Sequence, residues 1–422
     1  KQELGTFSDA KSFIDFLHDA GQKYWQILPL NPADSHGSPY AGLSSFAGNL
    51  NLLEGGEARL REEFSDFKPS AQYTEFVSTN AYWLEPYALF EAIKKEQDNK
   101  PVWQWEKKYQ VFNAAFFAAP QFQDEIEFQK FAQYRFFTEW QKVKNYANSK
   151  GIEIIGDMPY FVDAVSADAW QNPQLFSLNP DGSVAAKVGV PPDDYVPYGQ
   201  DWGFPAFDWK RMKEDNYAWW KARFKHAFEL YDIVRFDHFL GLFKEWEIPA
   251  GSSIEQGAWK EGPGLDFIKE VSKDFRDFRI IPEDLGVLDK LSLSVLRKNN
   301  IPSMDVLQFL VDDPDKYYCP SKNTVTYTST HDSTTALDWC KSKYGLNKKE
   351  AKVKLDKLIS KAYASRASIV ILSLQDVLKL GPEARMNVPG SVEGNWSWRA
   401  DANALTPEIA SELAKLTEKY KR

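Results

Sequence analysis

Cysteine and histidine are scarce in this sequence, and this limits the kinds of site it can form. The 422 residues include two cysteines, Cys319 and Cys340, and five scattered histidines. Two cysteines cannot build a disulfide framework, and their spacing matches no zinc motif. We therefore expect reduced thiols, a cytoplasmic protein and no structural metal.

Basic charge and long apolar runs are also lacking. The net charge is −9, which argues against a nucleic-acid partner, because such proteins usually carry a basic patch. No run of 18 apolar residues occurs, so we expect no membrane span. The chain begins KQELGTFSD, without methionine or a signal-peptide pattern, as a fragment would.

Aromatic residues, in contrast, are abundant: they make up 15% of the chain and include 15 tryptophans. Most of these rings must pack in a core. An aromatic plane also packs well against the C–H face of a sugar whose hydroxyls have polar partners. The composition alone leaves both interpretations open.

Short apolar runs alternate with helical patterns along the chain. We expect buried parallel strands at seven runs, at Tyr24–Leu28, Ile152–Ile155, Ile233–Phe236, Phe278–Pro282, Met304–Phe309, Val325–Tyr327 and Ser368–Leu372. Helical patterns cover Asp9–Ala20, Tyr217–Leu230 and Lys349–Ala364. This alternation predicts an α/β fold of βαβ units. A closed (β/α)8 TIM barrel needs eight strands, so we place the missing first strand before residue 1.

Two long insertions interrupt the predicted barrel, which we take as one catalytic domain over residues 1–422. Residues 31–150 read as a largely helical insertion, with apolar residues at helical spacing between Phe128 and Val143. Residues 161–210 are rich in proline, glycine and aromatic residues. Long loops in compact domains are usually functional or disordered, and this composition predicts a loop region that covers an active site.

Acidic side chains stand where four of the seven predicted strands end. They are Asp157, Asp237 with His238, Glu283 with Asp284, and Asp332 with His331. In a parallel barrel the carboxyl ends of all strands meet at one face, so these groups should converge there. Any single one of them has an alternative role as the cap of the following helix.

The residue types at these ends suit glycoside cleavage. Arg235 and Asp237 lie two residues apart on a strand and therefore face the same side, where a guanidinium favours a carboxylate that can act as a nucleophile. A drier, more acidic setting would raise the pKa of Glu283, as a general acid requires. A buried ion pair without a catalytic task, and a metal site of Asp and His, remain as alternatives.

The chain resembles 4-α-glucanotransferases of the amylomaltase (disproportionating enzyme) type, glycoside hydrolase family 77. The resemblance extends from LGTFSD to GNWSWR and rests on a combination of motifs. These are WQILPL, SPY with SSFAGN, GDMPYFV, VGVPPD with GQDWG, VRFDHF, IPEDLG, VLQF, STHDS and LQDVLKLGPEARMNVPG.

This resemblance implies a (β/α)8 barrel without a cofactor, and a first strand just before LGTFSD. It implies that Asp237 is the nucleophile, Glu283 the acid/base and Asp332 the transition-state stabiliser. The residues that it places around the substrate are Ser38, Tyr40, Asp157, Gln200, Trp202, Arg235, His238, Gly286, His331 and Asn387.

The family pattern is not kept everywhere. Leu240 stands where the family usually has Arg, and Phe204, the VPPDDYV stretch and Ser333 also depart from it. None of these changes touches the three carboxylates, but they leave acceptor preference and product length open.

We therefore expect an enzyme that transfers α-1,4-glucan segments between maltooligosaccharides by retaining double displacement, as a monomer or weak homodimer. An α-1,4-glucan hydrolase of the amylase type would use the same carboxylates, and a non-catalytic glucan-binding barrel is a further alternative.

Overall fold

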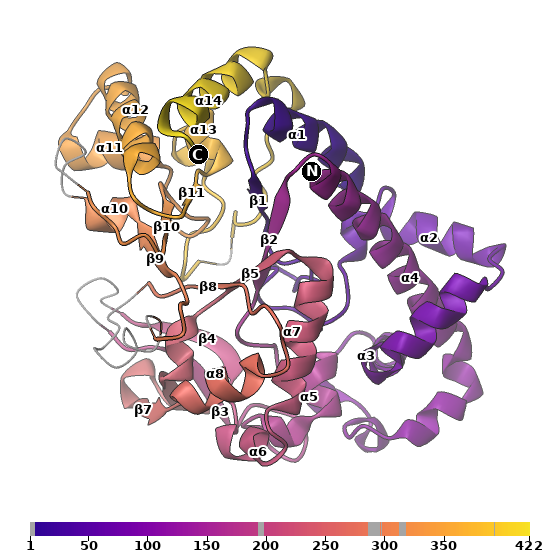
Figure 1. Cartoon of the computed structure of the whole chain (residues 1–422). Helices are drawn as coiled ribbons and strands as arrows, with labels where there is room; N and C mark the ends of the chain where they lie inside the picture. The colour runs from indigo at the N-terminus through magenta and orange to yellow at the C-terminus, as the bar shows by residue number, and fades with distance from the viewer. Residues whose placement is uncertain (1–4, 193–197, 286–295, 297, 312–317, 392) are drawn as a thin grey trace.

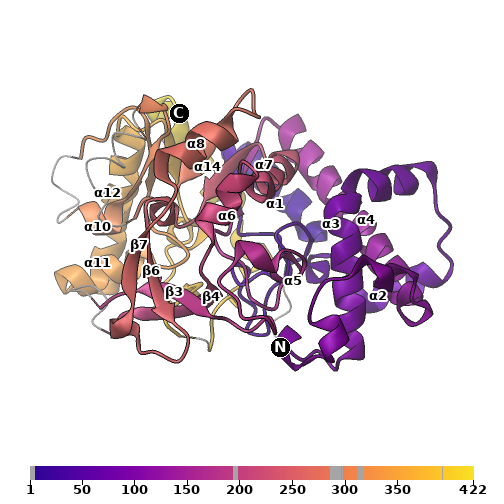
Figure 2. The ribbon, with the colours of Figure 1, turned by 90° about the horizontal axis from the view of Figure 1, so that it is seen from below.

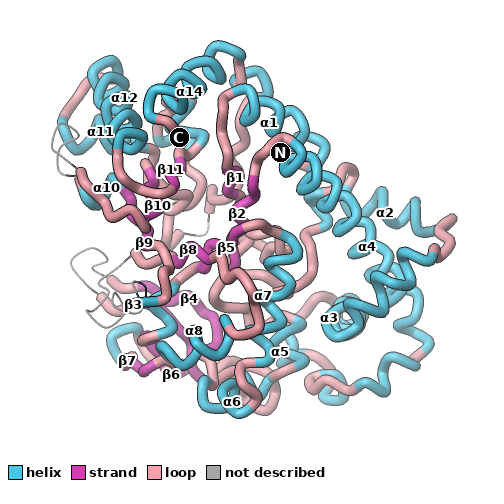
Figure 3. The backbone as a smooth tube through the Cα atoms, in the orientation of Figure 1, coloured by secondary structure: helices cyan, strands magenta, loops and turns pink. Residues whose placement is uncertain are grey.

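A row of seven parallel strands forms the centre of the protein (Figure 1, Figure 3). The computed structural model describes residues 5–192, 198–285, 296, 298–311, 318–391 and 393–422. Within these ranges the parallel strands are β1 (Tyr24–Gln26), β2 (Glu153–Met158), β5 (Ile233–Phe236), β8 (Ile280–Pro282), β9 (Ser303–Val306), β10 (Thr324–Tyr327) and β11 (Ile369–Ile371).

The spatial order of these strands follows their order in the chain. Hydrogen bonds link β1, β2, β5 and β8 into one parallel row and β9, β10 and β11 into a second. Strand β8 lies beside β9 and joins the two rows. Sequential parallel strands joined through helices are the arrangement of a (β/α)8 barrel. All seven predicted strands are present, with ends shifted by a few residues.

Apolar side chains from alternate strand positions fill the interior of the barrel. They are Ile155, Ile233, Ile281, Met304, Val306, Val325 and Tyr327. Because side chains alternate along a strand, Arg235 and Asp237 point to the same interior side as Ile233. The charged end of β5 therefore opens into one end of the barrel.

Helices cover the outside of the strands. The larger ones are α1 (Phe7–Asp19), α7 (Ala218–Leu230), α8 (Gly264–Ser272), α11 (Ala336–Tyr344), α12 (Lys348–Ala364) and α14 (Pro407–Tyr420), and the short ones are α10 (Leu307–Leu310) and α13 (Leu374–Val377). The three predicted helices correspond to α1, α7 and α12. One prediction was partly wrong: the run Met304–Phe309 leaves the strand at Val306 and continues as α10, because an apolar run of this length does not distinguish strand from helix.

Residues 31–150 form three long helices and several short 3-10 turns. The helices are α2 (Gly56–Ser65), α3 (Ala71–Glu96) and α4 (Pro120–Ser149), and they lie to one side of the barrel in Figure 2. The 3-10 turns are Leu50–Leu52, Val102–Gln104, Lys107–Tyr109 and Ala114–Ala118. The predicted apolar face lies on α4, where Phe128, Phe131, Trp140 and Val143 are buried.

Residues 161–210 are more regular than the loop that the sequence predicted. They include α5 (Ala167–Gln171), β3 (Ala186–Val190), β4 (Gln200–Pro205) and the start of α6 (Trp209–Glu214). Strands β3 and β4 join β6 (Lys244–Pro249) and β7 (Ala258–Glu261) in an antiparallel sheet of order β4-β3-β6-β7. These strands are short and partly exposed, so their sequences lack the continuous apolar run of a barrel strand.

The remaining short elements are 3-10 turns at Pro173–Leu175, Phe239–Leu242, Ile254–Gln256, Pro382–Ala384 and Ala402–Ala404. Across the described ranges, no helix is both long and apolar enough to cross a membrane.

Candidate active site

Arg235 is the centre of the charged group at the carboxyl end of the barrel. It is 3% exposed, and its Nη1 lies 3.0 Å from Oδ1 of Asp237 and 2.7 Å from both carboxyl oxygens of Asp157. The parallel register places Asp157 of β2 directly opposite Arg235 of β5. One guanidinium thus orients two carboxylates from neighbouring strands.

Asp157 is held from a second side by Tyr40, which comes from the long first insertion. The Tyr40 hydroxyl donates to Asp157 Oδ2 at 2.7 Å. Burial raises the pKa of Asp157, although the Arg235 charge and the Tyr40 hydrogen bond oppose this. Ser38 lies on the same loop, where its hydroxyl accepts from the Tyr40 amide at 3.3 Å and shapes the turn.

Glu283 follows β8, the neighbour of β5 on the other side. Its amide donates to the Phe236 carbonyl at 2.8 Å, and its carbonyl accepts from the Phe239 amide at 3.0 Å, so the ends of the two strands are joined. Burial raises the pKa of Glu283 to about 8; Asp237 and Asp284 add to the rise and Arg235 opposes it. The carboxyl group therefore keeps its proton at neutral pH, as the sequence predicted for a general acid.

Asp332 has the opposite setting. Asn387 Nδ2 donates to Asp332 Oδ1 at 2.6 Å, and His331 Nε2 lies 3.3 Å from Oδ2. Burial alone would raise its pKa, but His331, Asn387 and the charge of Arg235 outweigh burial and lower the pKa to about 2. Asp332 is therefore an anion throughout the neutral range.

Three aromatic rings lie beside Asp157 and Asp332. The Tyr40 and His331 rings stack with centroids 5.1 Å apart, and Trp396 lies 5.6 Å from Tyr40 and 5.9 Å from His331. Sequence reasoning missed Trp396, although it lies within the quoted GNWSWR motif. It also missed Arg385, whose Nη2 donates to the Asp332 carbonyl at 2.7 Å and which lies within the GPEARMNVPG motif.

His238, directly after Asp237, is enclosed by aromatic side chains. Its backbone is left-handed, with φ of 41°, and its ring lies edge-on to Trp202 at 4.8 Å. Burial lowers the pKa of His238 to about 4, so the ring is neutral at pH 7. Trp202 Nε1 donates to Gln200 Oε1 at 2.8 Å, which joins two β4 residues within the predicted covering region 161–210.

The structure thus places most of the predicted site residues around one end of the barrel. Gly286 lies outside the described residues. Within those residues, no group of three or more histidine, cysteine, aspartate and glutamate side chains is arranged to hold a metal ion.

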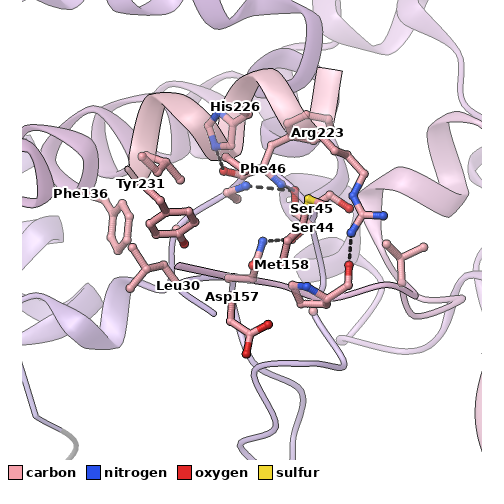
Figure 4. A pocket seen from close by; sticks show the side chains of 18 of the residues that line it. Leu30, Ser44, Ser45, Phe46, Phe136, Asp157, Met158, Arg223, His226 and Tyr231 are labelled. Carbon is pink, nitrogen blue, oxygen red and sulfur yellow. Dashed lines mark hydrogen bonds between the residues drawn. The ribbon is translucent and has the colours of Figure 1, made fainter. Parts of the chain in front are cut away.

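A small pocket beside the end of β2 is lined by Asp157, Met158 and Pro159 together with residues of α4 and α7 (Figure 4). The carboxyl group of Asp157 points away from the other labelled side chains in this view. Arg223 of α7 donates from Nη1 to the Tyr160 carbonyl at 3.0 Å and from Nη2 to the Pro159 carbonyl. The segment that follows Asp157 is therefore anchored to α7 by a buried guanidinium.

Comparison with known proteins identifies the family of the chain. Residues 1–66 and 57–405 match the family described as 4-alpha-glucanotransferase. The chain belongs to the 4-α-glucanotransferase family. Among curated members, the 4-alpha-glucanotransferase of Clostridium butyricum is 34% identical and the alignment covers 100% of this chain and 98% of the relative. That of Thermus thermophilus is 33% identical, with 98% and 94% covered.

Solved structures of the family show the same fold. The amylomaltase of Streptococcus agalactiae, solved in complex with acarbose, aligns with a TM-score of 0.89 at 29% identity and covers 100% of this chain and 96% of its own. The amylomaltase of Corynebacterium glutamicum aligns with a TM-score of 0.78 at 17% identity and covers 100% and 73%. At that identity the second match supports the fold alone.

Proposed function

We propose that this member of the 4-α-glucanotransferase family transfers α-1,4-glucan segments between maltooligosaccharides by double displacement. The observation that carries the proposal is the contrast between neighbouring carboxyl groups. Asp237 is oriented by an ion pair with Arg235 at 3.0 Å, whereas burial keeps Glu283 protonated with a pKa of about 8. A nucleophile beside an acid is what retaining glycoside chemistry requires.

In the first step, an Asp237 oxygen forms a bond to the anomeric carbon of the donor. The bond from that carbon to the leaving 4-oxygen breaks, and the Glu283 proton passes to this oxygen. In the second step, the 4-hydroxyl of an acceptor sugar attacks the same carbon. The bond to Asp237 breaks and the hydroxyl proton passes to Glu283, so the enzyme returns to its initial state without a net use of water.

The other predicted residues have supporting roles in this proposal. Asp332, ionised and held by Asn387, provides a negative charge for the cationic transition state and acceptors for sugar hydroxyls. The aromatic faces of Tyr40 and Trp202 suit the C–H face of a glucose unit. The region 161–210 would cover the covalent intermediate, so that sugar reaches it before water does.

Incubation of the protein with maltotriose tests the proposal. Transfer predicts a ladder of longer and shorter oligosaccharides together with glucose in the chromatogram. Products limited to glucose and maltose would show a hydrolase instead, and an unchanged sugar would favour a binding protein.

Asp237→Ala provides the matched test of the nucleophile. Because the covalent bond cannot form without this carboxylate, we expect transfer to fall by at least about a thousandfold. Full transfer activity in this variant would refute the assignment of Asp237.

A further inference from the structure

Glu245 on β6 is a buried carboxyl group that the proposed mechanism does not use. It is 2% exposed, and Trp209 Nε1 donates to its Oε2 at 3.3 Å. Its electrostatic neighbours in the described part of the chain are Tyr160, Trp209 and Glu247, and none of them is a cation. A buried charge without a cation partner is costly, so this carboxyl group needs another means of stabilisation.

The hydroxyl of Tyr160 is the remaining polar partner of Glu245. Tyr160 Oη and Glu245 Oε1 are both buried, and neither has a well-formed hydrogen bond to any described group. The two side chains nevertheless interact through their polar hydrogens and charges. Trp209 joins the two side chains, because its Nε1 donates to Glu245 Oε2 and its ring centroid lies 6.3 Å from that of Tyr160.

Tyr160 fills a tight slot beside the candidate active site. Its side chain is fully buried, and its carbonyl accepts from Arg223 Nη1 at 3.0 Å. A Cβ atom at Gly241 would lie 2.7 Å from the Tyr160 ring and 2.9 Å from the His238 ring, so only glycine leaves room here for both rings. The ring of Tyr160 lies edge-on to His238, with centroids 5.6 Å apart.

His238 links this slot to the reacting group, because it directly follows Asp237 and has a left-handed backbone. A shift of the Tyr160 ring would displace His238 and, with it, the backbone that carries Asp237. We propose that Glu245 is a positioning residue for glucan transfer, which holds His238 beside Asp237 through the buried phenol of Tyr160. This inference rests on the proposed function and extends it to a residue outside the sugar site.

The protonation of Glu245 follows from the same surroundings. Burial raises its pKa to about 8, against the hydrogen bonds of Tyr160 and Trp209, and the half-buried carboxyl group of Glu247 adds to the rise. Arg223 faces Tyr160 from α7, and His238 beside Tyr160 is neutral at pH 7. Glu245 is therefore a neutral acid at pH 7, able to share a proton with the phenol.

The proton on Glu245 makes the stability of the folded protein depend on pH. The folded protein retains a proton on Glu245 that the unfolded chain releases above the ordinary glutamate value of about 4.5. Folding stability from this group is consequently lost as the pH rises from about 4.5 to about 8. Glutamine has a similar shape and no charge, so Glu245→Gln should remove this loss.

The kinetic test compares Glu245→Gln, Glu245→Ala and the control Glu261→Gln with the wild type on maltotriose. Glu261 is an exposed glutamate on β7, opposite Lys244, and provides the same substitution outside the buried contacts of Glu245. We expect Glu245→Ala to lower kcat by roughly 10- to 100-fold with little change in KM, because misplacement of a reacting group acts on the chemical step. Glu245→Gln should retain kcat within about threefold of wild type, since its amide can also pair with the phenol. The control should match the wild type.

The pH profile separates Glu245 from Glu283, which has a similar pKa. In the wild type both groups lose a proton near pH 8, so log kcat should fall above that pH with a slope between about −1 and −2. In Glu245→Gln the slope should be about −1. Wild-type kcat in Glu245→Ala, or equal losses in the alanine and glutamine variants, would overturn the positioning role.

An infrared difference spectrum tests the protonation without using transfer activity. In a Glu283→Gln background, the carbonyl stretch of protonated carboxylic acids should be present at pH 7 and weaker when Glu245 is also changed to Gln, while buried groups such as Asp284 still contribute to it. No difference in that band at pH 7 would overturn the neutral acid. A wild type that gives no ladder from maltotriose would refute the proposed function itself, and this outcome is distinct from a failure of the Glu245 variants.

Discussion

Replacement of Glu283 by glutamine tests whether Glu283 is the general acid while Asp237 is the nucleophile. The glutamine side chain keeps the size of glutamate and an oxygen that can accept from the Leu285 amide, which now donates to Glu283 Oε1 at 3.0 Å. It removes only the transferable proton. With a pKa of about 8, about 90% of Glu283 is protonated at pH 7, so almost every wild-type molecule is ready for the first step.

The loss expected from this change depends on the leaving group. General acid catalysis contributes about 10²- to 10⁴-fold, so transfer from maltotriose by Glu283→Gln should fall by that factor. A fluoride ion leaves without protonation. With α-maltosyl fluoride as donor and azide as an acceptor that needs no base, the loss should be below about tenfold.

The assay measures kcat for both donors between pH 5 and 10. For wild type on maltotriose, kcat should fall about tenfold or more per pH unit above pH 8. The reaction of Glu283→Gln with the fluoride should not show the fall in kcat that ionisation of Glu283 causes. Asp237→Ala should stay inactive with both donors. Equal losses of Glu283→Gln on maltotriose and on the fluoride would refute the assignment of Glu283 as the acid.

Two further predictions concern the groups around the nucleophile. Arg235→Met would leave the buried carboxyl group of Asp157 without its cation, and we expect a loss of about 3–5 kcal/mol in the free energy of unfolding, measured with urea. Adding Asp157→Asn should restore part of it; a double variant no more stable than Arg235→Met would contradict this pairing. Trp202→Phe removes the hydrogen bond to Gln200 and should raise the share of hydrolysis over transfer several-fold, measured as new reducing ends from maltotriose. An unchanged ratio would show that Trp202 does not protect the intermediate from water.

The barrel strands were predictable because burial on both faces leaves a continuous apolar run. The run Ile233–Phe236 coincides with β5, all four residues of which are buried. The antiparallel sheet gave no such signal. Its strand β3 has two buried positions out of five and is followed by Pro191 and Pro192, so its pairing with β6 depends on contacts between distant segments.

Convergence of the site carboxylates was also predictable, because the ends of parallel strands share one face of a barrel. The buried residues that pack near these carboxylates were not predictable from the sequence. Tyr160 and Glu245 are 85 residues apart and lie on different elements, and an acidic residue on a short, partly exposed strand looks like a solvated one. The packing around Gly241 shows that the rings of Tyr160 and His238 lie close together.

The balance of charge explains why one glutamate in this site can remain an acid. Four carboxyl groups, those of Asp157, Asp237, Glu283 and Asp332, all experience the charge of a single buried cation, Arg235. The guanidinium contacts Asp157 and Asp237 directly, and Asp332 is stabilised separately by Asn387 and His331. Glu283 receives only the longer-range part of the Arg235 charge, which burial and the nearby anions outweigh. The proton of the proposed acid thus persists because the other carboxylates hold the direct contacts that would otherwise ionise it.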